Sequence, residues 1–196
     1  MEIVVSARPL MEAGGDVVVV ERYEGEGGLA AEAQRVDRAL DGLLSRALAE
    51  ERFEGRIGET THLHAAGRLA ATRVLVVGMG SRAECAAETV RRAASAALRR
   101  ARDLGARSVA TNLLGTRLPA RVRAEALVEG ALLGLYAFDR YKAPKGEERA
   151  VETLMVRVPE RDQAAVRQGV RVAELDRKST RLNSSHIQKS RMPSSA

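Results

Sequence analysis

The sequence predicts an α/β fold with a sheet between layers of helices, and three observations lead to this prediction. Short apolar runs alternate along the chain with longer segments of helical period. The runs at Asp16–Val20 and Arg73–Val77 are apolar at successive positions, as in strands that are buried on both faces. The chain of 196 residues is long enough to bury one core of this kind. Strands that alternate with amphipathic helices are typical of a layered sheet.

The first elements are two strands and a long helix. The strands are expected at Glu2–Ser6 and Asp16–Val20, where β-branched residues dominate. Gly25, Gly27 and Gly28 then open a loop, and a helix is expected at Leu29–Glu51. Its apolar stripe consists of Val36, Leu40, Leu43, Leu44, Ala47 and Leu48.

The middle of the chain repeats this order. Strands are predicted at Thr60–Ala65 and Arg73–Val77, and a second long amphipathic helix at Glu84–Leu104. Gly105 follows this helix at the position where a left-handed glycine commonly ends one. The remaining elements are a strand at Ser108–Leu114, a helix at Pro119–Tyr136, a strand at Val151–Val158 and the start of a helix at Arg161–Leu175.

The segment Glu129–Lys142, EGALLGLYAFDRYK, is the most informative part of the chain. Ala131, Leu132, Leu135 and Tyr136 lie at helical spacing, which predicts that this stripe faces a core. Gly130 and Gly134 are four residues apart, so a second backbone can approach this helix closely. Pro144 and Gly146 are expected to end the helix.

The tail at 176–196 differs from the rest, because it is polar, rich in serine and without any hydrophobic period. Its blocks DRKSTRLNSSH and RMPSSA match the translation of a common sequencing-library adapter, so we expect a non-native, disordered tail. The tail holds five of the 32 basic residues and one of the 26 acidic residues. Without it the net charge falls from +6 to +2, so the composition does not favour a nucleic-acid partner.

Other compositional features narrow the class of protein. The single cysteine excludes a disulfide framework. No apolar run approaches the ~20 residues of a membrane span, and the first residues lack the pattern of a signal peptide. We therefore expect a cytoplasmic protein without a membrane partner.

Three local features are candidate sites. Gly78-Met79-Gly80 is expected to form a turn between a strand and a helix, where backbone N–H groups can bind phosphate. No acidic residue ends a paired strand about 20 residues on, so a structural turn is the preferred interpretation. His62 and His64 share one face of a strand, but Glu59 falls on the opposite face, so a pair without metal is preferred. Cys85 reads as a small buried apolar residue.

The chain resembles the leucyl aminopeptidase family, the cytosol aminopeptidases, over residues 1–175. The resemblance rests on Glu129–Lys142, on Gly58-Glu59-Thr60 followed by Leu63-His64, on RVLVVGMG at 73–80 and on the helix at 91–110. It implies an N-terminal, macro-domain-like domain at 1–160, a mixed sheet sandwiched between helices, and an interdomain helix beginning at 161–175. Glu21-Arg22-Tyr23 departs from the expected apolar strand end and leaves the end of that strand uncertain.

The resemblance also implies a parent enzyme that is a homohexameric, cytoplasmic metallopeptidase acting on peptides with two divalent metals, Mn or Zn. The family's metal segment, Asn-Thr-Asp-Ala-Glu-Gly-Arg-Leu, does not occur in this sequence. We therefore assign no catalytic, cofactor-binding or metal-binding residue, and we expect this chain by itself to be inactive and to hold no metal. The alternatives are a DNA-binding module or a macro-like module for ADP-ribose or another nucleotide, with Gly25–Gly28 and Asp16 as loose ligand candidates.

Overall fold

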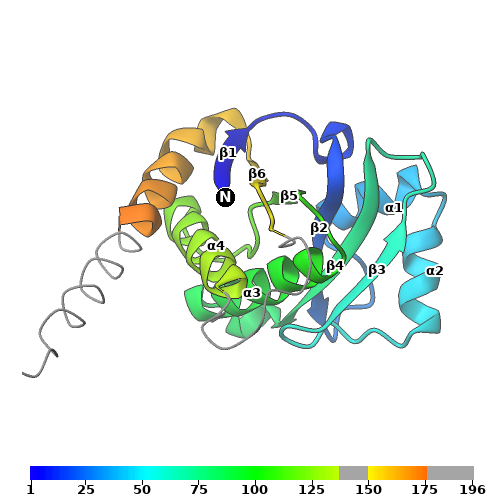
Figure 1. Ribbon diagram of the computed structural model, residues 1–196. Helices are drawn as coiled ribbons and strands as arrows, with labels where there is room; N and C mark the ends of the chain where they lie inside the picture. Colours follow the sequence, from blue (N-terminus) through cyan, green and yellow to red (C-terminus); the bar gives the residue numbers. More distant parts are fainter. Residues whose placement is uncertain (137–149, 176–196) are drawn as a thin grey trace, which may run out of the picture.

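A six-stranded mixed sheet organises the fold (Figure 1), in a computed structural model that describes residues 1–136 and 150–175. The strand order is β1-β6-β5-β2-β4-β3. The strands are β1 (Glu2–Ser6), β2 (Gly15–Glu24), β3 (Thr60–His64), β4 (Ala71–Ser81), β5 (Ser108–Asn112) and β6 (Thr153–Arg157). All neighbouring strands are parallel except β3, which runs antiparallel to β4 at the edge of the sheet. The predicted α/β class and mixed sheet are confirmed.

Helices cover both faces of this sheet (Figure 1). On one face, α1 (Ala31–Ala39) and α2 (Leu43–Glu50) enclose a core with the even-numbered valines of β2. On the other face, α3 (Ala87–Asp103), α4 (Ala120–Leu135) and a helix at 163–175 enclose a second core. Val17–Val20 are buried because the central strand β2 contacts both cores. None of the described helices is long and apolar enough to cross a membrane.

The helix predicted at Leu29–Glu51 is in fact two helices. Helix α1 ends before Leu40, and α2 begins after a turn in which Asp41 and Gly42 have φ values of 53° and 76°. An Asp-Gly pair tolerates such left-handed conformations, and its turn propensity outweighs the continuous apolar stripe. The predicted stripe is only partly confirmed, because Leu43 is exposed and Ala47 is partly buried, whereas the other members are buried, namely Val36, Leu40, Leu44 and Leu48.

Helix α3 ends as the sequence predicts. Gly105 has a φ of 78°, and the Ala106 N–H donates a hydrogen bond of 3.0 Å to the Ala101 carbonyl. This is the pattern of a Schellman motif, in which a left-handed glycine lets the last helical carbonyls find donors. The start of the helix was placed too early, because residues 82–84 form a separate turn of 3-10 helix.

The close approach predicted for Gly130 and Gly134 is confirmed, and the neighbour is α3. A Cβ at Gly130 would lie 2.9 Å from the carbonyl carbon and Cα of Arg91, and one at Gly134 would lie 2.5 Å from the Ser95 carbonyl oxygen. The predicted stripe is only partly buried, because Ala131 is enclosed whereas Tyr136 is 71% exposed. Phe138 to Lys142, Pro144, Gly146 and the tail at 176–196 lie outside the described residues.

Candidate ligand-binding site

The carboxyl ends of the parallel strands β2, β4 and β5 form the edge at which open α/β sheets bind ligands. Strand β2 reaches this edge because it continues through Glu21, Arg22 and Tyr23 to Glu24. The polar residues that left the end of this strand uncertain are therefore part of it. Strand alternation points Glu21 and Tyr23 to the α3/α4 face and Arg22 to the α1/α2 face.

On the α3/α4 face, Glu21 is a buried carboxylate that is only 4% exposed. Its Oε2 accepts a hydrogen bond of 2.7 Å from the Gly115 N–H, in the loop between β5 and α4. Burial raises the pKa of Glu21, although the Gly115 hydrogen bond and the charges of Arg123 and Arg82 act in the opposite direction. Arg123 also donates to the Leu114 carbonyl at 2.9 Å. Glu21 and Arg123, which carry opposite charges, therefore both hydrogen-bond the backbone of this loop.

Beside Glu21, Tyr23 and Arg82 form a second cluster. The Arg82 guanidinium lies 3.9 Å from the centroid of the Tyr23 ring, a cation–π contact. Arg82 also donates to Glu26 Oε2 at 2.8 Å and to Thr116 Oγ1 at 3.1 Å. The hydrogen bond from Arg82 lowers the pKa of Glu26, and burial raises the pKa of Tyr23.

These contacts show what the α3/α4 side of the edge does chemically. The Gly115 N–H and the Arg82 guanidinium on this side already bind carboxylates of this chain, and the Arg123 guanidinium donates to backbone carbonyls. The contacts therefore hold the loops after β2 and β5 in place and leave these donors engaged.

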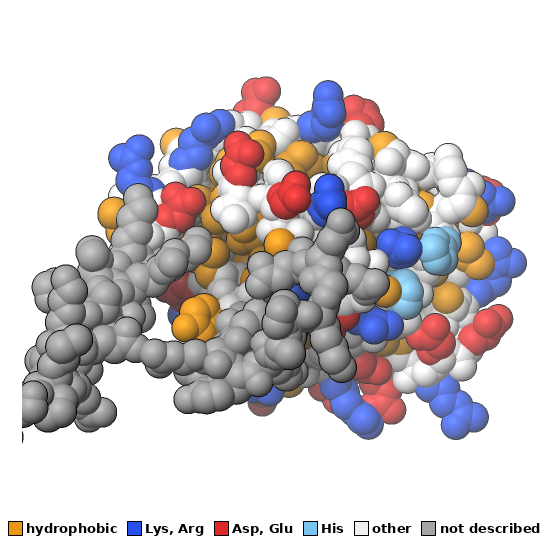
Figure 2. Space-filling view, in the orientation of Figure 1, with side chains coloured by type: hydrophobic (Ala, Val, Ile, Leu, Met, Phe, Trp, Pro, Cys, Tyr) orange, Lys and Arg blue, Asp and Glu red, His pale blue; other side chains and the backbone are white. Residues whose placement is uncertain are grey.

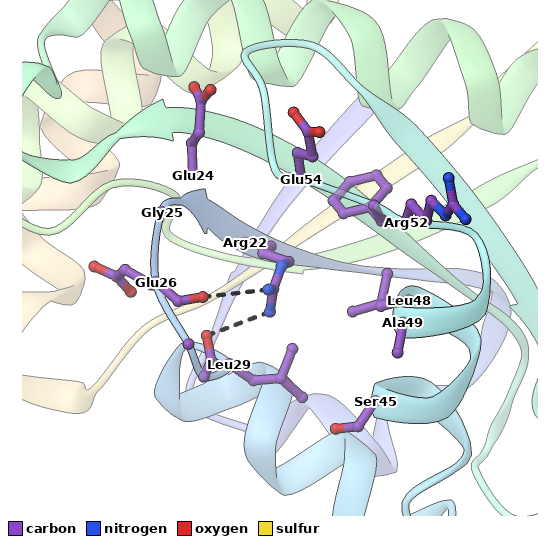
Figure 3. A pocket seen from close by; sticks show the side chains of 13 residues that line it. Arg22, Glu24, Gly25, Glu26, Leu29, Ser45, Leu48, Ala49, Arg52 and Glu54 are labelled. Carbon is purple, nitrogen blue, oxygen red and sulfur yellow. Dashed lines mark hydrogen bonds between the residues drawn. The ribbon is translucent and has the colours of Figure 1, made fainter.

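The α1/α2 side contains a cavity of about 660 Å³ between the loop after β2 and helix α2 (Figure 3). Arg22 lies in it and donates to the carbonyl oxygens of Glu26 at 3.2 Å and Gly28 at 3.4 Å. The apolar part of the lining is Leu29, Leu48, Ala49 and Phe53. This cavity lies at the carboxyl edge of the sheet, and its cation Arg22 was missed from the sequence. The signal was the register of Arg22, which continues the face of Val18 and Val20 two residues on along the strand.

The two candidates for a nucleotide site, Gly25–Gly28 and Asp16, lie far apart in the structure. Gly25–Gly28 follow the end of β2, whereas Asp16 lies at its beginning, roughly 30 Å away along a strand of this length. The Asp16 carboxylate accepts hydrogen bonds from the N–H groups of Ser108 at 2.9 Å and Arg107 at 2.8 Å. Asp16 thus joins β2 to β5 at the opposite edge of the sheet.

The predicted turn at Gly78-Met79-Gly80 is wrong. Strand β4 continues through these residues to Ser81, so they do not form the start of a helix. Gly78 is required for another reason: a Cβ there would lie 2.7 Å from the carbonyl carbon of Gly55. The glycine accommodates a crossing backbone segment rather than a phosphate.

The histidine pair lies on β3 at the surface, where Figure 2 shows it beside Lys or Arg side chains. The ring centroids of His62 and His64 are 6.5 Å apart, which confirms that both side chains share one face. Burial and the nearby charge of Arg100 lower the pKa of His62. Glu59 turns away and accepts the Gly55 N–H at 2.9 Å. Within residues 1–136 and 150–175 no group of three metal-ligating side chains is present, and the absence of a metal site stays a prediction.

Cys85 is 7% exposed and belongs to the core beneath α3, so its predicted role as a small buried residue is confirmed. A Cβ at Gly115 would lie 3.4 Å from its sulfur. The thiol therefore packs under the loop that Glu21 and Arg123 hold.

Known proteins share this fold and part of this sequence. Residues 17–145 match the family model described as the cytosol aminopeptidase family, N-terminal domain. A probable cytosol aminopeptidase from a Geobacter species is 39% identical over 168 residues, which cover 84% of this chain and 33% of that protein. The chain thus spans about a third of the length of the curated relatives it matches.

Two solved structures show the fold. A mutant tomato leucine aminopeptidase has a TM-score of 0.68 at 23% identity, covering 89% of this chain and 36% of that one. A mutant macrodomain from Oceanobacillus iheyensis has a TM-score of 0.67 at 15% identity, covering 89% of this chain and 92% of that one. At these identities the likeness concerns the fold alone, and it confirms the predicted macro-domain-like sandwich.

Proposed function

The chain belongs to the cytosol aminopeptidase family, whose N-terminal domain it contains, and on this premise we propose that it serves a cytoplasmic aminopeptidase as a non-catalytic domain. The parent enzyme would release N-terminal residues such as leucine from peptides, using two divalent metals, Mn or Zn, as a homohexamer. The family match over residues 17–145 carries this proposal. The share of its relatives' length that the chain covers also supports it.

The residues described here do not fit a pair of divalent metals. A two-metal hydrolase holds its ions with several carboxylates around a shared site and lowers the pKa of bound water. In this domain the buried carboxylate of Glu21 is bound by the Gly115 N–H. His62 and His64 have no third ligand beside them among the described residues. We therefore derive no catalytic step from this domain and propose that the metals and the reacting groups lie elsewhere in the parent enzyme.

Hydrolysis of leucine p-nitroanilide tests this proposal. The purified 196-residue chain, supplied with Mn²⁺ or Zn²⁺, should release no p-nitroaniline above the buffer rate. The positive control is a full-length cytosol aminopeptidase assayed in the same buffer. Hydrolysis by the chain that is metal-dependent and rises with protein concentration would contradict the non-catalytic role. Light scattering on the full-length parent should give the mass of six subunits, and a stable monomer would contradict the proposed hexamer.

A further inference from the structure

The cavity beside α2 has the properties of a small-molecule site. Its volume of about 660 Å³ lies within the range of roughly 300–1,000 Å³ that is usual for ligand pockets. Four apolar side chains line it, and Figure 3 shows Leu29 and Leu48 extending into the space beside Arg22. Such a lining favours an apolar group. Two arginines, Arg22 and Arg52, also line the cavity, and they favour an anionic group on the ligand.

Arg22 is a cation that lacks a carboxylate partner among the described residues. Its guanidinium donates only to the carbonyls of Glu26 and Gly28, and its buried Nε has no hydrogen-bond acceptor there. The carboxylate of Glu26 points away from Arg22 (Figure 3) and is bound by Arg82. Arg22 is partly buried, and a carboxylate forms a stronger hydrogen bond with a guanidinium than a carbonyl does, so an incoming carboxylate would improve the environment of Arg22.

The charges at the rim indicate which kind of anion fits. Glu24 and Glu54 also line the cavity, and in Figure 3 both side chains point away from Arg22. Glu54 is paired with Arg56, whereas Glu24 has no ion-pair partner among the described residues and favours a positive group on the ligand. A zwitterion therefore satisfies both charges, with its carboxylate on Arg22 and its ammonium group near Glu24 at the rim.

We propose that this cavity binds a free apolar α-amino acid of the leucine class. The carboxylate contacts Arg22, and the side chain packs against Leu29, Leu48 and Phe53. The ammonium group lies at the rim near Glu24. This site goes beyond the proposed peptidase role, since binding requires no hydrolysis. Only the choice of leucine as the probe rests on that role, because leucine is in the product class of such an enzyme.

Calorimetric titration of the 196-residue chain with L-leucine and L-leucinamide tests the site. Leucine should bind, and leucinamide, which lacks the carboxylate, should bind at least about tenfold more weakly. Equal or tighter binding of leucinamide would show that Arg22 does not recognise a carboxylate. The absence of any heat with millimolar leucine would also overturn the proposal. Neither result bears on hydrolysis by the full-length enzyme, so the two proposals fail separately.

Three variants locate the site. Arg22→Gln should weaken leucine binding roughly tenfold to a hundredfold, as expected for the loss of a charge-assisted hydrogen bond. Arg52→Gln is the matched control: it removes the same charge from the same lining, but Arg52 points away from Arg22 in Figure 3. The leucine affinity should be unchanged in this control. An equal loss of affinity in both variants would show that any positive charge in the lining has the same effect, and would contradict a specific contact with Arg22.

The third variant fills the cavity without touching Arg22. Ala49 is an exposed lining residue on α2, so Ala49→Phe adds volume where no buried contact is lost. This variant should keep the urea midpoint of the parent chain and lose leucine binding. Ala49→Phe leaves the hydrogen bonds of Arg22 in place. It therefore tests whether leucine binds in this cavity even if Arg22→Gln loosens the loop after β2. Unchanged leucine affinity in Ala49→Phe would place binding elsewhere.

Discussion

At Gly130 the backbone of α4 leaves no room for a side chain beside α3, and Gly130→Ala tests whether this contact sets the distance between the helices. A Cβ at this position would lie 2.9 Å from two carbon atoms of Arg91 and closer still to its carbonyl oxygen. Carbon atoms in contact are normally about 3.5–4.0 Å apart. The helices would have to separate by roughly 0.6–1.1 Å, because the obstacle is backbone and cannot rotate away.

Two opposing effects set the magnitude of this prediction. Alanine is favoured over glycine inside a helix by about 1 kcal/mol. Overpacking costs about 1–3 kcal/mol, and the upper end applies because the fully buried Ala97, Leu127 and Ala131 lose contact as the helices separate. The expected net loss is about 2 kcal/mol, equivalent to a fall of roughly 4–8 °C in Tm for a chain of this length.

Urea unfolding followed by circular dichroism measures this change. The midpoint should fall in Gly130→Ala, and the slope should stay unchanged if the transition remains two-state. Gly14→Ala is the matched control, because a Cβ there would meet nothing within 4 Å. It should change the stability by less than about 0.5 kcal/mol. A Gly130→Ala protein as stable as the parent would refute the reasoning, since helix propensity would then outweigh the close approach.

Two further predictions concern pH. Burial raises the pKa of Glu21 in the folded state above the unfolded pKa of about 4.3. The stability that Glu21 contributes is therefore full below the unfolded pKa, and it falls as pH rises through the folded pKa. The stability of the parent relative to Glu21→Gln should therefore decrease from pH 4 to pH 8 in urea titrations, and a flat difference would contradict this. Partial burial acts to raise the pKa of Asp16, but the hydrogen bonds from Ser108 and Arg107 outweigh it and lower the pKa. Asp16→Ala should thus cost about 1–3 kcal/mol at pH 7, and this loss should shrink as pH falls through the folded pKa; a pH-independent loss would argue against the ionised carboxylate.

The features predictable from the sequence are those set by neighbours along the chain. The four valines after Asp16 require a strand buried on both faces, and β2 is such a strand. Gly105 after an amphipathic run predicts a left-handed helix end, which the structure has. Gly130 and Gly134 predict a close helix contact, although the sequence does not say that the partner is α3.

The features that could not be predicted depend on residues far apart in the chain. Gly78 has the local sequence of a turn, but the backbone of residues 55–56 crosses it, and this contact keeps the glycine inside a strand. Glu21 interrupts an apolar run and reads as the end of a strand. Its acceptor role becomes clear only when Gly115, 94 residues later, is placed beside it. Arg22 is similar, because its cavity is completed by α2.

The carboxyl edge of the sheet shows why two proteins with the same fold need not bind the same ligand. This edge is the usual binding place in open α/β sheets. Here an anion on the α3/α4 side would have to displace Glu21 from the Gly115 N–H and Glu26 from Arg82. The neighbouring cation on the other face, Arg22, is bound only to carbonyl groups among the described residues. The placement of Glu21, Arg22 and Glu26 on β2 and the loop that follows it, rather than the topology, therefore decides which hydrogen-bond donors at this edge are already bound to a carboxylate.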